Sequence, residues 1–83
     1  MPKSVRTSEY RKLLQELKKC QDEVALTQID MANKLGKPQS YISKVLSGER
    51  RMDVLELMQI CDILEVETAE LLAKIKVKPG KKR

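Results

Sequence analysis

Five polar residues between positions 39 and 47 are spaced so that a helix would carry them together on its outer side. Their side chains are short or forked hydrogen-bonding groups with one cation and no acid, whereas an ordinary solvated helix face mixes Glu with Lys. A surface that lies between two phosphate backbones excludes acids. Glutamine can bond adenine bidentately, lysine can reach the acceptors of guanine, and serine can bond either base. The pattern favours contact with base edges in a major groove. The five residues are Gln39, Ser40, Ser43, Lys44 and Ser47.

Further donors flank this stretch and suit phosphate oxygens, which position a protein without reading sequence. The start of a preceding helix would also offer free backbone N–H groups to an anion. Simpler roles remain open. Lys44 could be an ordinary solvated lysine, and Gln39 and Ser40 could serve only the helix start. Arg50 and Arg51 could pair with acids such as Asp53 or Glu56. The expected phosphate contacts are Thr27, Gln28, Lys37, Tyr41, Arg50 and Arg51.

Two short helices must position these groups, and the sequence predicts them over residues 28–35 and 39–46. Thr27 and Asp30 resemble a capping box at the first helix start. Gly36 ends that helix, because a turn there needs a backbone conformation that a side chain would strain. Pro38 is tolerated at the start of the second helix. Such a pair, joined by a turn of about three residues, is the helix-turn-helix pattern. The inward residues would be Met31, Ala32, Leu35, Ile42, Val45 and Leu46.

The rest of the chain also reads as helical, because apolar residues recur at spacings of three and four and no stretch alternates as a strand would. We expect helices over 8–21, 54–64 and 68–75, and therefore an all-α domain of five helices. The helix over 54–64 is apolar nearly all round, which indicates a central position in the core or cover by a partner. A single domain is expected over 8–75, with a flexible segment at 1–7 and a basic flexible tail at 76–83.

Charge and composition narrow the class of function. The net charge is +5, but residues 53–73 hold six acids and no base, whereas residues 74–83 hold six bases and no acid. Segregation of this kind suits a polyanion on one side of the molecule only, and it equally fits solvated helix faces with a flexible basic tail. The chain has no histidine and only two cysteines, so no four-ligand zinc site and no catalytic constellation are expected. No apolar run approaches a membrane span, and Met1–Arg6 lacks an apolar signal core, so we expect a cytoplasmic protein that is not an enzyme.

The motifs in order along residues 10–72 resemble the XRE family, the Cro and phage-repressor (C1) type of helix-turn-helix protein. The resemblance implies a compact five-helix, lambda-repressor-like domain, usually dimeric, that binds two operator half-sites about one helical turn, ~34 Å, apart. Gln28, Gln39, Ser40 and Lys44 match the family's contact positions, and Tyr41, Ser43 and Ser47 correspond less closely. The matching segments are Leu26-Thr27-Gln28, Ala32, Leu35-Gly36-Lys37-Pro38-Gln39-Ser40, Ser43-Lys44 and Gly48-Glu49-Arg50-Arg51.

Several positions depart from the family pattern. Pro38 stands where a Ser or Thr cap is usual, and Glu65 stands where glycine often ends the fourth helix, which leaves that helix boundary open. The family often pairs an Arg late in the first helix with a Glu in the third, and here the matching positions are Gln21 and Leu46. Replacing both partners of a buried ion pair can be neutral, so the departure is consistent with the fold.

The expected function is sequence-specific binding of double-stranded DNA by a transcriptional regulator, a repressor that acts as a dimer on an inverted-repeat operator. Leu71, Leu72 and Ile75 are the candidate dimer contacts, because the last two helices hold a surplus of apolar residues. No small-molecule ligand, cofactor or metal is expected. The alternatives are a protein-interaction adaptor that uses the acidic strip, and an antitoxin or restriction-controller component with the same fold.

Overall fold

A computed structural model describes residues 8–75, and all regular structure in that range is helical. The helices are α1 (Ser8–Glu23), α2 (Gln28–Leu35), α3 (Gln39–Ser47), α4 (Val54–Ile63) and α5 (Thr68–Ile75). The predicted all-α class with five helices is therefore confirmed. The bounds of α2 and α5 are as predicted, α1 is two residues longer than expected, and α3 and α4 differ by one residue at their ends. The predictions for 1–7 and 76–83 lie outside the described residues.

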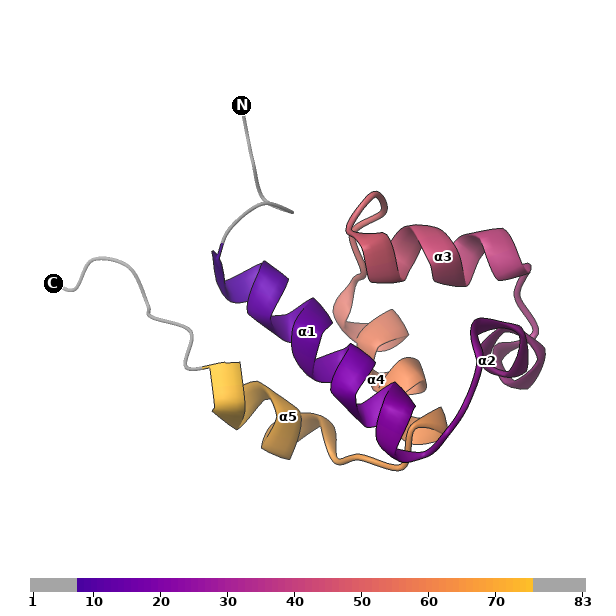
Figure 1. The fold of residues 1–83 in the computed structure, drawn as a ribbon. Coiled ribbons are helices and arrows are strands. Elements are labelled where there is room, and N and C mark those ends of the chain that lie inside the picture. The colour runs from indigo at the N-terminus through magenta and orange to yellow at the C-terminus, as the bar shows by residue number, and fades with distance from the viewer. Residues whose placement is uncertain (1–7, 76–83) are drawn as a thin grey trace, which may run out of the picture.

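α1 crosses the middle of the molecule and packs against α5, which lies alongside it, and against α3 (Figure 1). α3 packs mainly against α2 and α1, whereas α4 packs against α2 and α5. One side of α3 therefore lies at the edge of the molecule (Figure 1). Between residues 8 and 75, no helix is long and apolar enough to cross a membrane.

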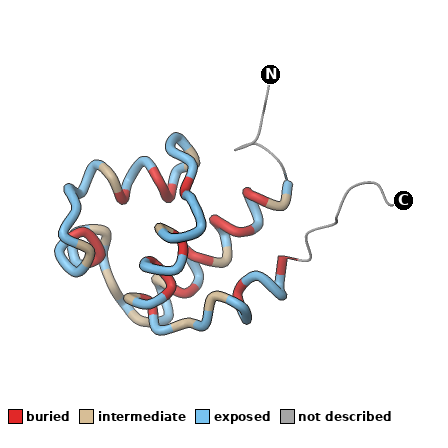
Figure 2. The backbone as a smooth tube through the Cα atoms, turned by 180° about the vertical axis from the view of Figure 1, so that it is seen from behind, coloured by how far each residue is buried: buried red, intermediate tan, exposed pale blue. Residues whose placement is uncertain are grey.

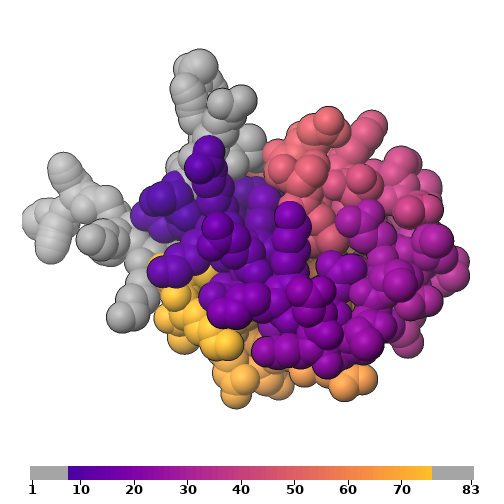
Figure 3. Space-filling model, in the orientation of Figure 1, coloured from indigo at the N-terminus to yellow at the C-terminus, as the bar shows by residue number. Residues whose placement is uncertain are grey.

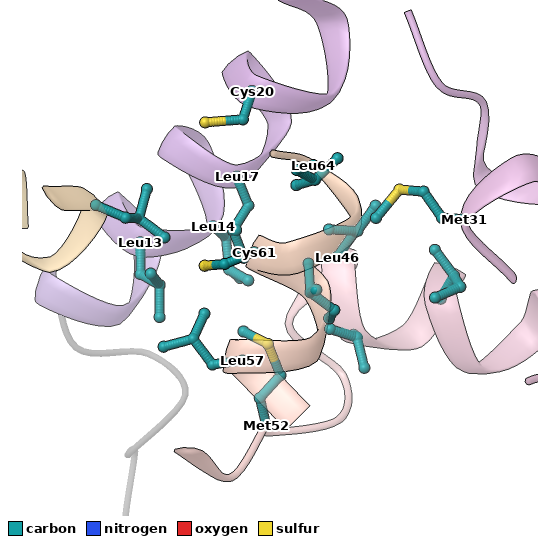
Figure 4. Packing of buried hydrophobic residues seen from close by; sticks show 14 of the residues in the cluster. Leu13, Leu14, Leu17, Cys20, Met31, Leu46, Met52, Leu57, Cys61 and Leu64 are labelled. Carbon is teal, nitrogen blue, oxygen red and sulfur yellow. The ribbon is translucent and has the colours of Figure 1, made fainter. Parts of the chain in front are cut away.

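One hydrophobic cluster holds all five helices together (Figure 4). Its fully buried members include Leu17 of α1, Met31 of α2, Ile42 of α3 and Ile60 of α4. Buried residues line the inward sides of the helices, and exposed ones line the outward sides (Figure 2). The segment 54–64, which the sequence shows to be apolar nearly all round, contributes only some of its side chains to the core. Leu57, Ile60, Cys61 and Leu64 are buried, whereas other apolar residues of α4 are exposed.

Two helices begin with capping boxes, and the sequence predicts the one at the start of α2. Asp30 and Thr27 each accept a hydrogen bond from the other's backbone N–H at 3.0 Å. At the start of α4, Asp53 and Glu56 exchange the same pair of bonds, at 2.8 and 3.0 Å. Each box satisfies two backbone donors that a helix start would otherwise leave without a partner.

Three helices end in a Schellman motif, in which a residue with left-handed backbone follows the helix. The residues in this position are Ala25, Gly36 and Glu65, with φ of 58°, 69° and 62°. At the end of α4, the N–H of Val66 reaches the carbonyl of Cys61 at 3.0 Å, which closes the helix. The boundary that the sequence left open is thus set by backbone hydrogen bonds, with Glu65 held in a conformation that favours glycine.

The unusual pair Gln21 and Leu46 fits the fold without an ion. The Gln21 side chain donates a hydrogen bond to the carbonyl of Leu26 at 2.9 Å and so braces the loop between α1 and α2. Leu46 is buried in the core. A buried apolar side chain and a side chain-to-backbone hydrogen bond thus occupy the two positions where the resemblance led us to look for an ion pair.

Candidate nucleic-acid interface

The turn between α2 and α3 is fixed by the backbone. Gly36 adopts φ 69°, and a Cβ built on it would meet nothing within 4 Å. Glycine is therefore favoured here by backbone conformation and not by space. The N–H of Lys37 donates to the carbonyl of Ala32 at 3.0 Å, and Pro38 starts α3 without a side-chain cap. The result is a tight helix-turn-helix unit, as the sequence predicts.

The outward side of α3 is exposed and carries no acid. Ile42, Val45 and Leu46 point into the core and are nearly inaccessible to solvent. The five polar residues that the sequence places on the outer side of this helix are each exposed. In the space-filling view, α2 and α3 together form the right-hand side of the molecule (Figure 3). The exposed members are Gln39, Ser40, Ser43, Lys44 and Ser47.

Ser47 has a local task at the end of α3. Its hydroxyl donates to the carbonyl of Lys44 at 3.1 Å and accepts from the N–H of Glu49 at 3.3 Å. A serine hydroxyl has one donor and two acceptor sites, so the donor is used and one acceptor site is left. Ser47 is therefore less suited to bind a base than Gln39, Ser40, Ser43 and Lys44.

The start of α2 requires a correction. The sequence suggested that Thr27 would offer a free N–H to an anion, but that N–H donates to Asp30 Oδ2 and the Thr27 hydroxyl accepts from Asp30 N–H. Hydrogen bonding of the Asp30 carboxyl to the Thr27 backbone N–H, and then to the Thr27 side chain, lowers the pKa of that carboxyl, which is charged at neutral pH. The available donors are instead the N–H groups of Gln28 and Ile29, which have no acceptor within the helix.

Tyr41 lies between two cations on the surface of α3. The Lys37 ammonium nitrogen lies 5.1 Å from the centre of the Tyr41 ring, and the Arg50 guanidinium carbon lies 4.9 Å from it. Burial raises the pKa of the Tyr41 hydroxyl, and the neighbouring Glu56 carboxylate raises it further. The hydroxyl therefore keeps its proton at neutral pH. Its single donor hydrogen-bonds to the Glu56 carboxylate, which contributes to that raised pKa.

The loop between α3 and α4 holds both predicted arginines at its surface. Arg50 forms an ion pair with Glu56, with 2.8 Å between Nη2 and Oε2, which is one of the pairings that the sequence left open. Arg51 is different, because its guanidinium carbon lies 4.9 Å from the centre of the Tyr10 ring. Both side chains are exposed. Each can still present a positive charge to solvent from a position that an aromatic ring helps to fix.

Tyr10 lies in this region and was not singled out from the sequence. Tyr10 accepts a hydrogen bond from the buried N–H of Met52 at 3.0 Å, across 42 positions of the chain, and so ties the loop to α1. Glu56 was named as one possible partner of the two arginines, and the structure shows that its Oε2 binds Arg50 while its Oε1 caps α4. A capping box can be recognised from neighbouring residues. The Tyr10–Met52 and Arg50–Glu56 contacts cannot, because they depend on how the loop between α3 and α4 folds against α1 and α4.

The described residues, 8–75, contain no group of three or more His, Cys, Asp or Glu side chains that could hold a metal ion. Cys20 and Cys61 are buried free thiols, and burial raises the pKa of each. Neither is thereby activated, because the thiolate is the reactive form. The chemistry available at the surface of α3 is thus hydrogen bonding and attraction of anions.

A tight helix-turn-helix whose second helix exposes an acid-free polar face defines a DNA-binding domain of the lambda-repressor-like type. The helix-turn-helix family model HTH_3 matches residues 11–71, and the chain belongs to this family, the XRE family of DNA-binding transcription regulators. A solved structure, an XRE-family like protein from Pseudomonas syringae pv. tomato str. DC3000, is 35% identical with a TM-score of 0.83. The similarity covers 89% of this chain and 90% of that one. The search of the curated proteins found no match.

Proposed function

We propose that the protein is a repressor of transcription that binds an inverted-repeat operator as a homodimer, with α3 of each protomer in a major groove. The observation that carries the proposal is the exposed face of α3, where Gln39, Ser40, Ser43 and Lys44 stand without an acid among them. A protein that acts on the chromosome must share its compartment, so we infer a cytoplasmic location.

Different residues supply specificity and general affinity in this proposal. Gln28, Gln39, Ser40 and Lys44 would contact base edges, because their groups match the donor and acceptor pattern of the major groove. Contacts to phosphate would come from the flanks, where three cations and the half-buried Tyr41 lie. Those contacts would make binding strongly dependent on salt. The flanking residues are Lys37, Tyr41, Arg50 and Arg51.

Selection of duplexes from a random pool by the parent protein tests this proposal and yields the operator and its half-site spacing. Lys44→Ala should then lose discrimination at one base pair, by ~1–3 kcal/mol. Lys18→Ala is the matched control, because Lys18 is an exposed lysine of α1 and its loss removes the same charge. If Lys44→Ala discriminated among duplexes as well as the parent and the Lys18 control, α3 would not be the reading helix. No binding to any duplex at low salt would instead favour an adaptor function.

The proposed dimer contact lies on α4 more than on α5. Leu71 and Ile75, two of the three residues that the sequence suggested, are buried in the core of the single chain, and Leu72 is exposed. The apolar face left to solvent consists of Val54, Leu55, Met58 and Leu72, whose exposed fractions are 62%, 66%, 51% and 39%. Contiguous apolar surface of this kind is typical of an interface.

A two-fold axis near the middle of the stretch Leu55–Met58 would make this face self-complementary. Arg51 precedes that stretch by nearly as many residues as Asp62 follows it, so antiparallel α4 helices would bring Arg51 of each protomer toward Asp62 of the other. Sedimentation at micromolar concentration should give a dimer for the parent and a monomer for Leu55→Lys. A parent that sediments only as a monomer would contradict this arrangement.

A further inference from the structure

Glu56 is an acid that lies beside the surface proposed to bind DNA. Its side chain is only 17% exposed, while that of its partner Arg50 is 43% exposed. An acid in this place should by itself repel a polyanion. Its effect on DNA binding therefore depends on whether it does more than add negative charge.

The two carboxylate oxygens of Glu56 have different partners in α4 and the preceding loop, and the Tyr41 hydroxyl also hydrogen-bonds to this carboxylate. Oε1 accepts from the N–H of Asp53 at 3.0 Å and belongs to the capping box of α4. Oε2 accepts from Nη2 of Arg50 at 2.8 Å. The guanidinium so held lies 4.9 Å from the centre of the Tyr41 ring on α3. Glu56 thus connects the first turn of α4 to the exposed surface of α3 through Arg50.

This connection fixes Arg50 from several directions. Its backbone N–H donates to the carbonyl of Lys44 at 3.0 Å, and Nη1 lies 3.4 Å from the carbonyl oxygen of Arg51. The opposite cation, Lys37, lies 5.1 Å from the centre of the same Tyr41 ring. α3 packs mainly against α2 and α1, so the Glu56–Arg50 pair adds a link from α3 to α4 at the end where the loop begins.

We propose that Glu56 is a positioning residue for DNA binding, which holds the Arg50 guanidinium against Tyr41 in the place where it meets a phosphate. The inference rests on the proposed function of α3 and its flanks as the DNA-binding surface. Holding a flexible cation in its bound position lowers the entropy lost on binding. Removal of the acid therefore weakens binding, although charge alone would strengthen it.

The opposite signs of these two effects supply the test. Glu56→Gln keeps an oxygen for the capping box, which Gln also forms, and removes the charge that pairs with Arg50. We expect binding to the selected operator duplex to weaken about two- to fivefold, the range that corresponds to a partly exposed ion pair. The slope of log affinity against log salt should also fall, because a mispositioned Arg50 neutralises less phosphate charge. Fluorescence anisotropy across a salt series measures both.

Glu49→Gln is the matched control, because Glu49 is an exposed acid of the same loop whose side chain makes no ion pair within residues 8–75. This variant should bind as tightly as the parent or more tightly. A double-mutant cycle with Arg50→Gln isolates the pair. In the Arg50→Gln background, Glu56→Gln should no longer weaken binding. Circular dichroism at the assay temperature identifies the variants that are folded and can be compared.

The inference is overturned if folded Glu56→Gln binds as tightly as the parent or more tightly, like the Glu49 control. It is also overturned if Glu56→Gln weakens binding equally when Arg50 is already replaced, because the effect would then not pass through Arg50. A parent protein that binds no duplex at low salt would overturn the proposed function itself. That outcome is distinct, because it is seen before any variant is made.

Discussion

The hydroxyl of Tyr10 reaches across the fold to a backbone donor that has little access to water. It accepts from the N–H of Met52 at 3.0 Å, and both residues are only 8% exposed. Met52 follows Arg51 directly, so this bond anchors the loop that presents the arginines to the surface of α1. Tyr10→Phe removes the hydroxyl and keeps the ring, on which Arg51 lies at 4.9 Å.

The expected cost follows from the donor that the substitution leaves behind. A buried N–H without its acceptor costs about 1–3 kcal/mol. For a domain of this size, each kcal/mol of lost stability lowers Tm by about 4–8 °C. Urea unfolding followed by circular dichroism should therefore show a lower midpoint with an unchanged slope, which indicates a change in stability and not in the compactness of the unfolded state.

Tyr41→Phe is the matched control for this prediction. Tyr41 is half-buried, and its hydroxyl interacts with the Glu56 carboxylate instead of a buried backbone donor. Its loss should cost about 0.5 kcal/mol or less, as is usual for surface positions. The reasoning is refuted if Tyr10→Phe and Tyr41→Phe lower the free energy of unfolding by the same amount, or if Tyr10→Phe changes it by less than about 0.5 kcal/mol.

Three other predictions concern stability. Positions 36 and 65 both have left-handed backbone, which favours glycine. Glu65→Gly should therefore raise the free energy of unfolding by about 0.5–1 kcal/mol, and Gly36→Ala should lower it by about 1–2 kcal/mol. Urea titrations in which both substitutions changed the free energy of unfolding in the same direction would contradict this. The pKa of Asp30 lies below its ordinary value of 3.8 because of its bonds to Thr27, so its contribution is complete above that pH and is lost as pH falls further. Asp30→Asn should therefore lose less stability than the parent between pH 5 and pH 2, and parallel curves would exclude the effect. Leu17→Ala, at a fully buried position, should cost about 2–5 kcal/mol and leave much of the protein unfolded at 37 °C by circular dichroism.

The sequence by itself determined the parts of this protein that depend on neighbours along the chain. The bounds of α2 follow from Thr27 and Asp30 at its start and Gly36 at its end, all within one turn of the helix they define. The exposed face of α3 follows from helical periodicity, because Ile42, Val45 and Leu46 had to be buried. The family pattern over the helix-turn-helix unit is equally local, and it was confirmed.

Only the tertiary structure decided which polar side chains already have a partner within the protein and which apolar side chains are buried. The sequence could not choose between phosphate and Glu56 as the partner of Arg50, because the choice depends on how the loop after α3 folds back onto α4. Nor could the sequence show which apolar residues of the last two helices are buried in the core and which are exposed. Leu71 and Ile75 turned inward while Leu55 and Met58 stayed at the surface. Burial of this kind depends on the positions of all five helices together, and periodicity within one helix does not contain that information.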